Sequence, residues 1–328
     1  MSIFFGLMHI RLRFLIIELL TVFIWVLGFC HTWEKPALPF ELKDSMSISA
    51  PDTSVATILR VGDTLKIVDS TRINTPGELE FILDRHAVGD TVMLRIMGSI
   101  SPEPYIAAVT VKRFYSPIYF LFTVLGAGML FAIAYLVRIQ RPVGKDVEIF
   151  HLFCLGIGTL IMTASGHYPM SLGIGYLVSA VFYTTYTFTP VLILIFSRVF
   201  PTDRRSETVQ LESILIKVAA SLAGLLVISF IAAAGSNFLT IFKIHIILFR
   251  ISQVLFAGVI ILAIVSFYLA YQTSIQESDR RKILWIASGG SITMILFIGL
   301  WLLPRFITGH PVLHTKMLFL LMTVPPIS

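Results

Sequence analysis

Hydroxyl and imidazole side chains inside long apolar runs are the first candidates for chemistry in this chain. His151 lies near one end of such a run, where an ionisable residue is a functional hypothesis by default. Residues 183–190 form the most polar segment within any run and close with a proline. Their hydroxyls could line a ligand cavity or, equally, bond neighbouring helices. The candidate polar site comprises His151, Tyr183, Thr185, Tyr186 and Thr189.

Proteolytic and metal chemistry have weaker support in the sequence. A site-2 type metalloprotease needs two histidines and a glutamate on one helix face, and no His-Glu-x-x-His occurs. Residues 163–167 are similar to a rhomboid serine-protease loop, with His245 in another run, but small residues that allow close helix packing explain them better. With no phospho-acceptor box and no nucleotide-binding motif, these residues are predicted not to form an enzyme, and no cofactor or metal is expected.

Composition places these candidates in a membrane. Of the 328 residues, 56% are hydrophobic and 13% are charged, whereas about 25% charged is usual in soluble domains. The net charge of +6 could suggest a nucleic-acid partner, but Lys and Arg flank the apolar runs in short clusters. These clusters are topology signals, so no nucleic acid is expected. The 2 cysteines are too few for a disulfide framework.

Apolar runs predict eight membrane spans. Residues 1–30 hold the first span, expected to be an anchor because no small-x-small cleavage site follows it. The multi-span bundle, residues 115–328, holds the others at 117–138, 147–167, 172–198, 213–234, 241–271, 283–303 and 317–328. The last run would cover only roughly 18 Å of about 30 Å of hydrocarbon. We therefore expect an input module separated from an output part.

Loop charges orient the predicted spans. Cationic clusters around 138–145, 198–205 and 280–282 fall on one side, which the positive-inside rule makes cytoplasmic. The N-terminus is then cytoplasmic, and residues 31–114 are extracytoplasmic. The C-terminus points back toward the cytoplasm, where an effector would fit.

Residues 31–114 predict a small α+β domain. Residues 55–59 and 64–68 are strand-like, and the alternating runs 92–96 and 106–111 indicate two further strands. Thr75, Pro76 and Glu78 form a capping box that opens a helix. The expected order is β-β-α-β-β.

Three parts of this segment resemble the C-terminal two-thirds of a bacterial PDZ domain: residues 60–69 with Ile73, residues 75–79, and residues 89–96. A PDZ domain captures an extended peptide at a sheet edge and binds its terminal carboxylate with loop N–H groups. The family's glycine-containing carboxylate loop has no counterpart, because residues 40–51 contain no glycine. The fold class expected is thus a polytopic α-helical membrane protein with a small α+β PDZ-like domain.

The PDZ resemblance also implies a candidate peptide groove. Leu79, Ile82, Leu83 and His86 would lie near its helix side. The alternative interpretation places the three aliphatic side chains in the domain core and His86 on the surface. An extracytoplasmic peptide or an envelope protein is the corresponding partner.

The membrane part resembles the multi-span sensor region of bacterial histidine kinases related to the competence quorum-sensing kinase. The resemblance rests on Arg141 and Pro142 at a helix entry, residues 195–201, residues 279–286 and residues 302–304. It implies a bacterial cytoplasmic (inner) membrane, a two-component signalling system and a catalytic part outside these residues. Membrane lipids and a second copy of the chain are the other expected partners. A membrane scaffold or a transporter-like protein is the alternative, although no convincing internal repeat is found.

Overall fold

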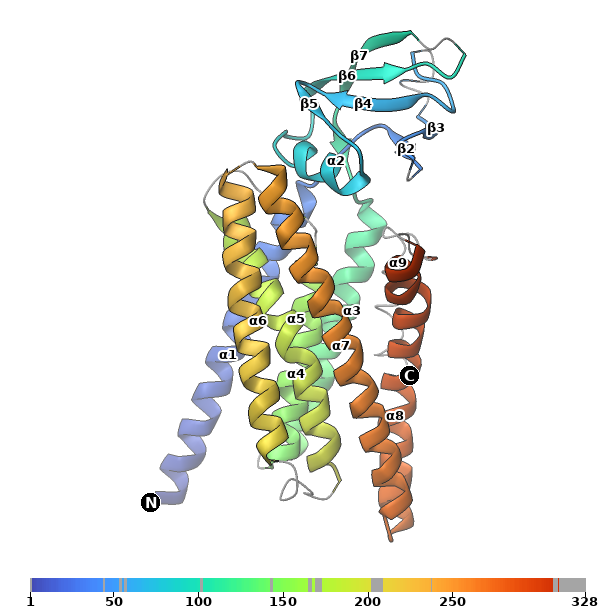
Figure 1. The fold of residues 1–328 in the computed structure, drawn as a ribbon. Coiled ribbons are helices and arrows are strands. Elements are labelled where there is room, and N and C mark those ends of the chain that lie inside the picture. The colour runs from blue at the N-terminus through green and yellow to red at the C-terminus, as the bar shows by residue number, and fades with distance from the viewer. Residues whose placement is uncertain are drawn as a thin grey trace.

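The computed structural model is a bundle of long helices with a small domain of strands at one end (Figure 1). The N-terminus lies at the opposite end of the bundle. The structure describes residues 2–43, 45–52, 55, 58–100, 103–141, 144–164, 167–168, 173–201, 209–236, 238–308 and 312.

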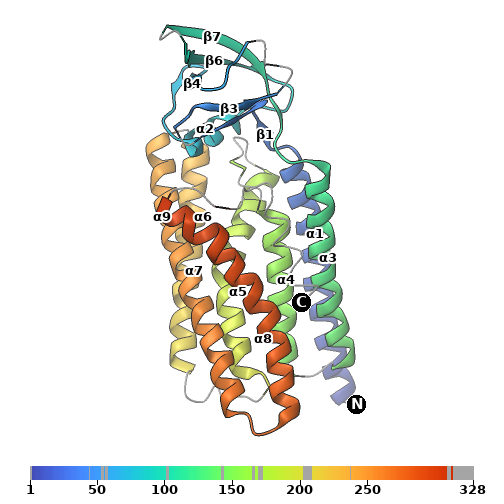
Figure 2. The same ribbon diagram turned by 90° about the vertical axis from the view of Figure 1, so that its right-hand side faces the viewer.

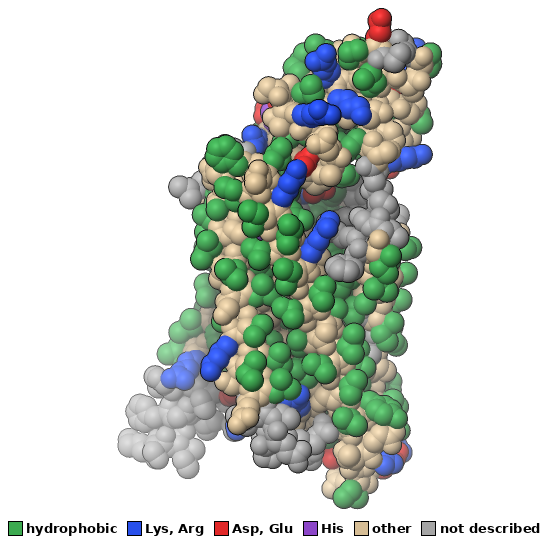
Figure 3. Space-filling model, viewed as in Figure 1, with side chains coloured by type: hydrophobic (Ala, Val, Ile, Leu, Met, Phe, Trp, Pro, Cys, Tyr) green, Lys and Arg blue, Asp and Glu red, His purple; other side chains and the backbone are tan. Residues whose placement is uncertain are grey.

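Six helices are long and apolar enough to cross a membrane. They are Leu12–Trp33 within α1 (Ser2–Trp33), α3 (Pro117–Gln140), α4 (Lys145–Thr163), α5 (Ile174–Val199), Gln210–Ser236 within α6 (Val209–Ser236), and α7 (Leu239–Thr273). Apolar side chains dominate the visible surface of the bundle, as Figure 3 shows. A surface of this kind is stable against lipid. The chain is therefore a polytopic α-helical membrane protein.

The predicted count of eight spans is not confirmed. The run 283–303 corresponds to α8 (Glu277–Phe297) and a π-helical turn, η2 (Ile298–Leu302), which leads into α9 (Leu303–Thr308). Five of the six residues 277–282 are charged, so α8 lacks a sufficiently long apolar stretch before the helix changes at η2. The predicted span 317–328 lies outside the described residues.

Helix α1 fits closely against α4 because two glycines remove side chains from their interface. A side chain at Gly28 would collide with the carbonyl oxygen of Met162, and one at Gly158 would collide with the indole of Trp25. The indole Nε1–H of Trp25 donates a hydrogen bond to Thr159 Oγ1 at 3.0 Å. Close backbone approach of this kind is a usual source of helix association in lipid.

In its described residues, the domain of strands contains three antiparallel sheets and one helix. The largest sheet has the strand order β5-β4-β6-β7, β1 pairs with β8, and β2 pairs with β3. The elements are β1 (Pro36–Ala37), β2 (Phe40–Leu42), β3 (Ile48–Pro51), β4 (Thr64–Val68), β5 (Thr71–Arg72), α2 (Pro76–Leu83), β6 (Thr91–Met97), β7 (Pro104–Thr110) and β8 (Lys112–Arg113).

Local sequence signals locate the three longest strands and the helix of this domain. The expected strands at 64–68, 92–96 and 106–111 correspond to β4, β6 and β7. At the start of α2, Thr75 Oγ1 accepts from the Glu78 N–H at 3.2 Å, and Glu78 Oε2 accepts from the Asn74 N–H at 2.8 Å. The strand expected at 55–59 is wrong where it is described, because the N–H of Ile58 bonds to the carbonyl of Val55 in a turn.

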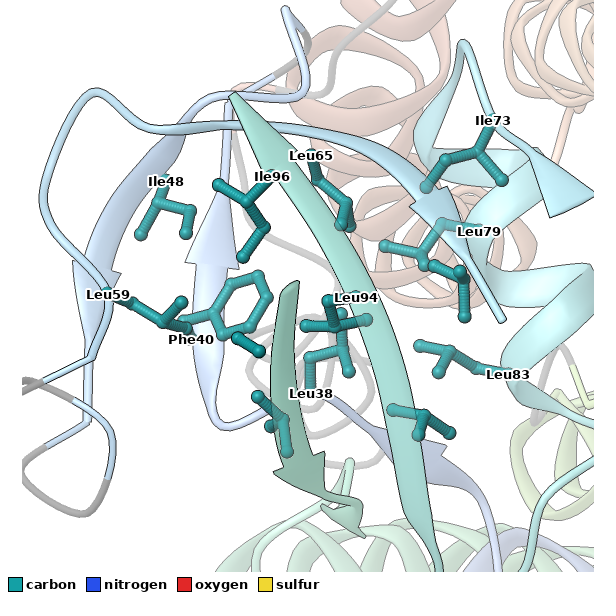
Figure 4. Packing of buried hydrophobic residues seen from close by; sticks show 14 of the residues in the cluster. Leu38, Phe40, Ile48, Leu59, Leu65, Ile73, Leu79, Leu83, Leu94 and Ile96 are labelled. Carbon is teal, nitrogen blue, oxygen red and sulfur yellow. The ribbon is translucent and has the colours of Figure 1, made fainter. Parts of the chain in front are cut away.

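Alternate residues of β4, β6 and β7 point to a common apolar core (Figure 4). Leu65, Leu94 and Ile96 are fully buried there. Helix α2 closes this core with one face. Burial of this kind is the main source of stability for a domain of this size.

The domain joins the membrane at two adjacent points. Helix α1 leads into β1 and β8 leads into α3, and β1 and β8 are hydrogen-bonded to each other. Beside this pair of strands, the ring centroids of Trp33 at the end of α1 and Phe120 at the start of α3 lie 4.7 Å apart. In Figure 2, α1 and α3 stand together on one side of the bundle, with α6 and α7 on the other.

Candidate functional site

Helix α2 is shared between the domain and the bundle. Its residues 79, 82 and 83 share one face because i, i+3 and i+4 positions are neighbours on a helix, and they pack in the domain core. Phe81 points the other way and is fully buried. Its ring stacks on Phe242 of α7 at 4.5 Å and meets the ring of Tyr168 edge-on at 5.8 Å.

A charged contact supports this aromatic one. Lys243 Nζ of α7 lies 3.0 Å from Glu78 Oε1, and the Glu78 side chain is only 3% exposed. Burial favours the protonated form of Glu78, but hydrogen bonding from the Asn74 N–H and the nearby ammonium of Lys243 outweigh burial and lower its pKa. Glu78 therefore stays ionised while it faces the bundle.

Beside α2 lies the junction cluster, which we define as His31, Lys35, Glu80, Asp84 and His167. Asp84 Oδ2 accepts a hydrogen bond from the Tyr168 N–H at 2.7 Å, while Oδ1 lies 3.9 Å from His167 Nε2. The His167 ring stacks on the His31 ring at 4.5 Å. Lys35 Nζ lies 3.6 Å from Glu80 Oε2. The cluster thus joins α1, α2 and the residues that follow α4.

Burial sets the protonation of the junction cluster. It raises the pKa of Asp84 to about 7, against the opposing effect of Lys35. It also lowers the pKa of His167 to about 3, helped by His31 and Lys35. Burial alone would lower the pKa of Lys35, but Glu80 and Asp84 raise it overall. The arrangement therefore holds a neutral imidazole and a fixed ammonium beside a carboxyl group that can change charge near neutral pH.

A second buried site lies within the bundle and connects α5, α6 and α7. Tyr183 Oη lies 2.8 Å from His245 Nε2, and Ser229 Oγ lies 2.9 Å from His245 Nδ1. Ser229 Oγ also donates to the carbonyl of Leu226, so it accepts from His245 Nδ1–H. In this triad, each ring nitrogen of His245 thus has a hydroxyl partner within hydrogen-bond distance.

Comparisons with protein-family models, with curated proteins and with solved structures find no match to this chain. Its function must therefore be argued from its own geometry. Within the described residues, no group of three or more His, Cys, Asp or Glu is placed to hold a metal ion.

The structure divides the candidate polar site predicted from the sequence. Tyr183 belongs to the triad, but His151 lies elsewhere, with Nε2 3.4 Å from Glu18 Oε1 and Nδ1 3.3 Å from the carbonyl of Ala134. Arg138 Nη1 donates to the same Glu18 oxygen at 2.8 Å. His151 thus belongs to an ion-paired contact between α1, α3 and α4.

The remaining predicted residues of that site lie at contacts between or within helices. Thr189 Oγ1 donates to the carbonyl of Thr185 within α5 at 2.8 Å. A side chain at Gly156 would approach both threonines, so that glycine allows α4 to lie close to α5. The Tyr186 ring stacks on Phe256 of α7 at 4.8 Å.

The residues of the predicted peptide groove are placed as follows. Leu79, Ile82 and Leu83 are buried at 7%, 3% and 4% exposure in the domain core. His86 Nε2 lies 3.0 Å from Asp69 Oδ2 on the outer part of the domain. The three aliphatic side chains therefore offer no open surface to a ligand in this conformation.

Sequence reasoning did not single out Asp84, Lys35 or Ser229. Only the folded chain brings them to their partners. Asp84 and its partner Tyr168 are 84 residues apart in the sequence, and Ser229 and its partner His245 are 16 residues apart. The sequence signal for a buried polar site was an ionisable side chain in an apolar run. His245 carries this signal as plainly as His151 does.

Proposed function

We propose that the chain is the membrane input module of a signal-transducing receptor, and that its effector is a histidine kinase region outside these residues. The observation that carries the proposal is the double packing of α2. The same short helix closes the domain core through Leu79 and inserts Phe81 against α7. A change in the domain that moves α2 must therefore also disturb the bundle.

Helix α7 is suited to carry such a disturbance across the membrane. It has 35 residues, which at 1.5 Å per residue gives a length of about 52 Å. Near its start it contacts α2 through Phe242 and Lys243. Near its other end, Tyr271 lies beneath the guanidinium of Arg280 of α8 at 5.8 Å. Packed helices with two arrangements are a common basis for signalling.

The resemblances in the sequence specify the rest of the proposal. The domain is PDZ-like and extracytoplasmic, and it detects an extracytoplasmic peptide or an envelope protein. The protein is a homodimer in a bacterial cytoplasmic membrane. Because Leu79, Ile82 and Leu83 are buried, a peptide would engage a sheet edge rather than the α2 face that carries these residues.

A reporter fusion tests this function. Residues 1–328 would be joined to the cytoplasmic part of a histidine kinase, and phosphorylation of its response regulator would be measured in membranes. Phe81→Ala should shift the kinase output, since it releases α2 from α7. The matched control is Phe238→Ala, because Phe238 is 66% exposed beside the same end of α7.

Two outcomes separate signalling from its alternatives. A shift with Phe81→Ala but not with Phe238→Ala would support the input module. Kinase output equal to that of the unchanged protein in both variants, with both variants present at normal amounts in the membrane, would contradict it. A scaffold or a transporter-like protein would then be the better description.

A further inference from the structure

A pocket of about 440 Å³ lies at the end of the bundle away from the domain, between α3, α4, α5 and α8. Its size is typical of sites for small molecules. Aromatic and aliphatic side chains form its wall, including Phe150, Phe196 and Phe200. Arg141, Arg281 and Lys282 line its edge, with Asp146 as the one carboxylate among the lining residues. The pocket is thus amphipathic and carries an excess of positive charge.

The two cations from α8 have exposed ion-pair partners that a new anion could replace. Arg281 Nε lies 3.5 Å from Glu277, and Lys282 Nζ lies 2.8 Å from Asp279, both on the same helix. The Arg281 and Lys282 side chains are 75% and 48% exposed. Ion pairs this exposed contribute little to stability. A phosphate between the helices could therefore replace those carboxylates at little cost.

The pocket also lies at the boundary between the membrane and water. Arg141 directly follows the last residue of α3, Gln140, and Asp146 stands in the first turn of α4. Trp285 lines the pocket and is 72% exposed. Tryptophan favours the headgroup level of a bilayer, and basic pockets between spans at that level bind anionic lipid headgroups.

We propose that this pocket binds one anionic phospholipid. Its phosphate lies between Arg141, Arg281 and Lys282, and an acyl chain covers the wall around Phe196 and Phe200. An inorganic phosphate would satisfy the cations but leave the apolar wall uncovered, whereas a zwitterionic lipid would carry a choline into a cationic site. Charge and wall together therefore select a lipid with a net negative headgroup.

Lipid titration by native mass spectrometry tests the proposal on the full chain in detergent. Phosphatidylglycerol should bind more tightly than phosphatidylcholine. The site variant is Arg141→Gln with Lys282→Gln, and each lost cation should weaken phosphatidylglycerol binding about fivefold. The control variant, Arg13→Gln with Lys217→Gln, removes two exposed cations from the same half of the bundle, outside this pocket. It should bind the lipid as the unchanged protein does.

Further arms separate the possible results. Arg141→Lys with Lys282→Arg keeps the charge and should keep the binding. If the double glutamine variant melts at a lower temperature, Lys282→Gln alone, at a side chain that is 48% exposed, takes its place and should still weaken binding about fivefold. Millimolar inorganic phosphate should not displace the lipid. Equal losses in the site and control variants would overturn the proposal, and so would equal binding of phosphatidylcholine. Displacement by inorganic phosphate would show a phosphate site and not a lipid site.

Discussion

The junction cluster and the Tyr183–His245–Ser229 triad both contain buried polar side chains, yet they are built on opposite principles. In the triad, both imidazole nitrogens of His245 have hydroxyl partners within hydrogen-bond distance. The junction cluster holds two carboxyl groups, an ammonium and two imidazoles, and Asp84 Oδ1 has no hydrogen bond among the described residues. The first arrangement favours one fixed packing, whereas the second can change charge. The site that can switch thus lies where the domain meets the bundle.

The largest expected effect comes from the aromatic contact that holds these two regions together. Phe81→Ala should weaken docking of the domain by about 3–5 kcal/mol, because it removes a fully buried ring. Amide hydrogen exchange in residues 239–246 should then become faster. Phe238→Ala is the control, with its side chain 66% exposed. Unchanged exchange in the Phe81 variant would show that α2 is not coupled to α7.

The pH dependence of the junction cluster should be the next largest effect. The folded state raises the pKa of Asp84 to about 7, so it binds a proton that the unfolded chain releases near pH 4. The Asp84 contribution to stability is therefore full below that pH and declines as pH rises toward 7, by at most about 1.4 kcal/mol per pH unit. The pKa of His167 is lowered to about 3, so its contribution declines as pH falls from about 6.5.

Single substitutions separate these two opposing slopes. The melting temperature of His167→Gln should fall as pH rises from 4 to 7, because only the Asp84 slope remains. The melting temperature of Asp84→Asn should fall as pH drops below 6.5, because only the His167 slope remains. Glu103→Gln, at an exposed acid, should behave as the unchanged protein. Identical pH profiles for all these proteins would refute the assignment. The charged and titratable groups facing Asp84 and His167 are His31, Lys35, Glu80 and Tyr115.

The triad should give a smaller effect without this pH dependence. Tyr183→Phe removes one hydrogen bond inside the bundle, and such bonds contribute about 0.6–2 kcal/mol in membranes. Thermal unfolding in detergent should show a loss of that size that is the same at pH 5 and pH 8. Tyr268→Phe is the matched control, because Tyr268 is 61% exposed. A loss that varied strongly with pH would mean that His245 titrates.

The smallest effect is expected at Lys243. Its side chain is 61% exposed, and Glu78 keeps its hydrogen bond from the Asn74 N–H when Lys243 is removed. Lys243→Gln should therefore cost about 1 kcal/mol or less, with the difference reduced by salt. Thermal unfolding at low and high salt would measure it. A loss as large as that of Phe81→Ala would make charge, rather than aromatic packing, the main docking force.

Local signals were sufficient for much of the fold. Apolar runs located the long helices, and the pattern Thr75-Pro76-Gly77-Glu78 located the start of α2. β2 and β3 were missed because each is only three or four residues long and contains a turn-prone or acidic residue. The count of eight spans is not confirmed: charges at 277–282 precede the last described run, the π-turn η2 falls within it, and residues 317–328 lie outside the described part of the chain.

The site was predicted less well than the fold because it depends on distant contacts. Tyr183 was singled out by its polar surroundings, but its partner lies 62 residues further along the chain. His151 stands out in the sequence in the same way, yet it meets Glu18 and Arg138 instead. A single sequence shows that such residues need partners but does not show which ones.

The pairing of β1 with β8 has a mechanical consequence. The two chain segments that enter and leave the domain are fastened to each other, and Gly28 and Gly158 lock α1 against α4. On the far side, contacts of α2 hold the domain to α7. The β1–β8 edge is therefore a hinge. A stimulus that broke the contact between α2 and α7 would tilt the domain about this edge rather than detach it.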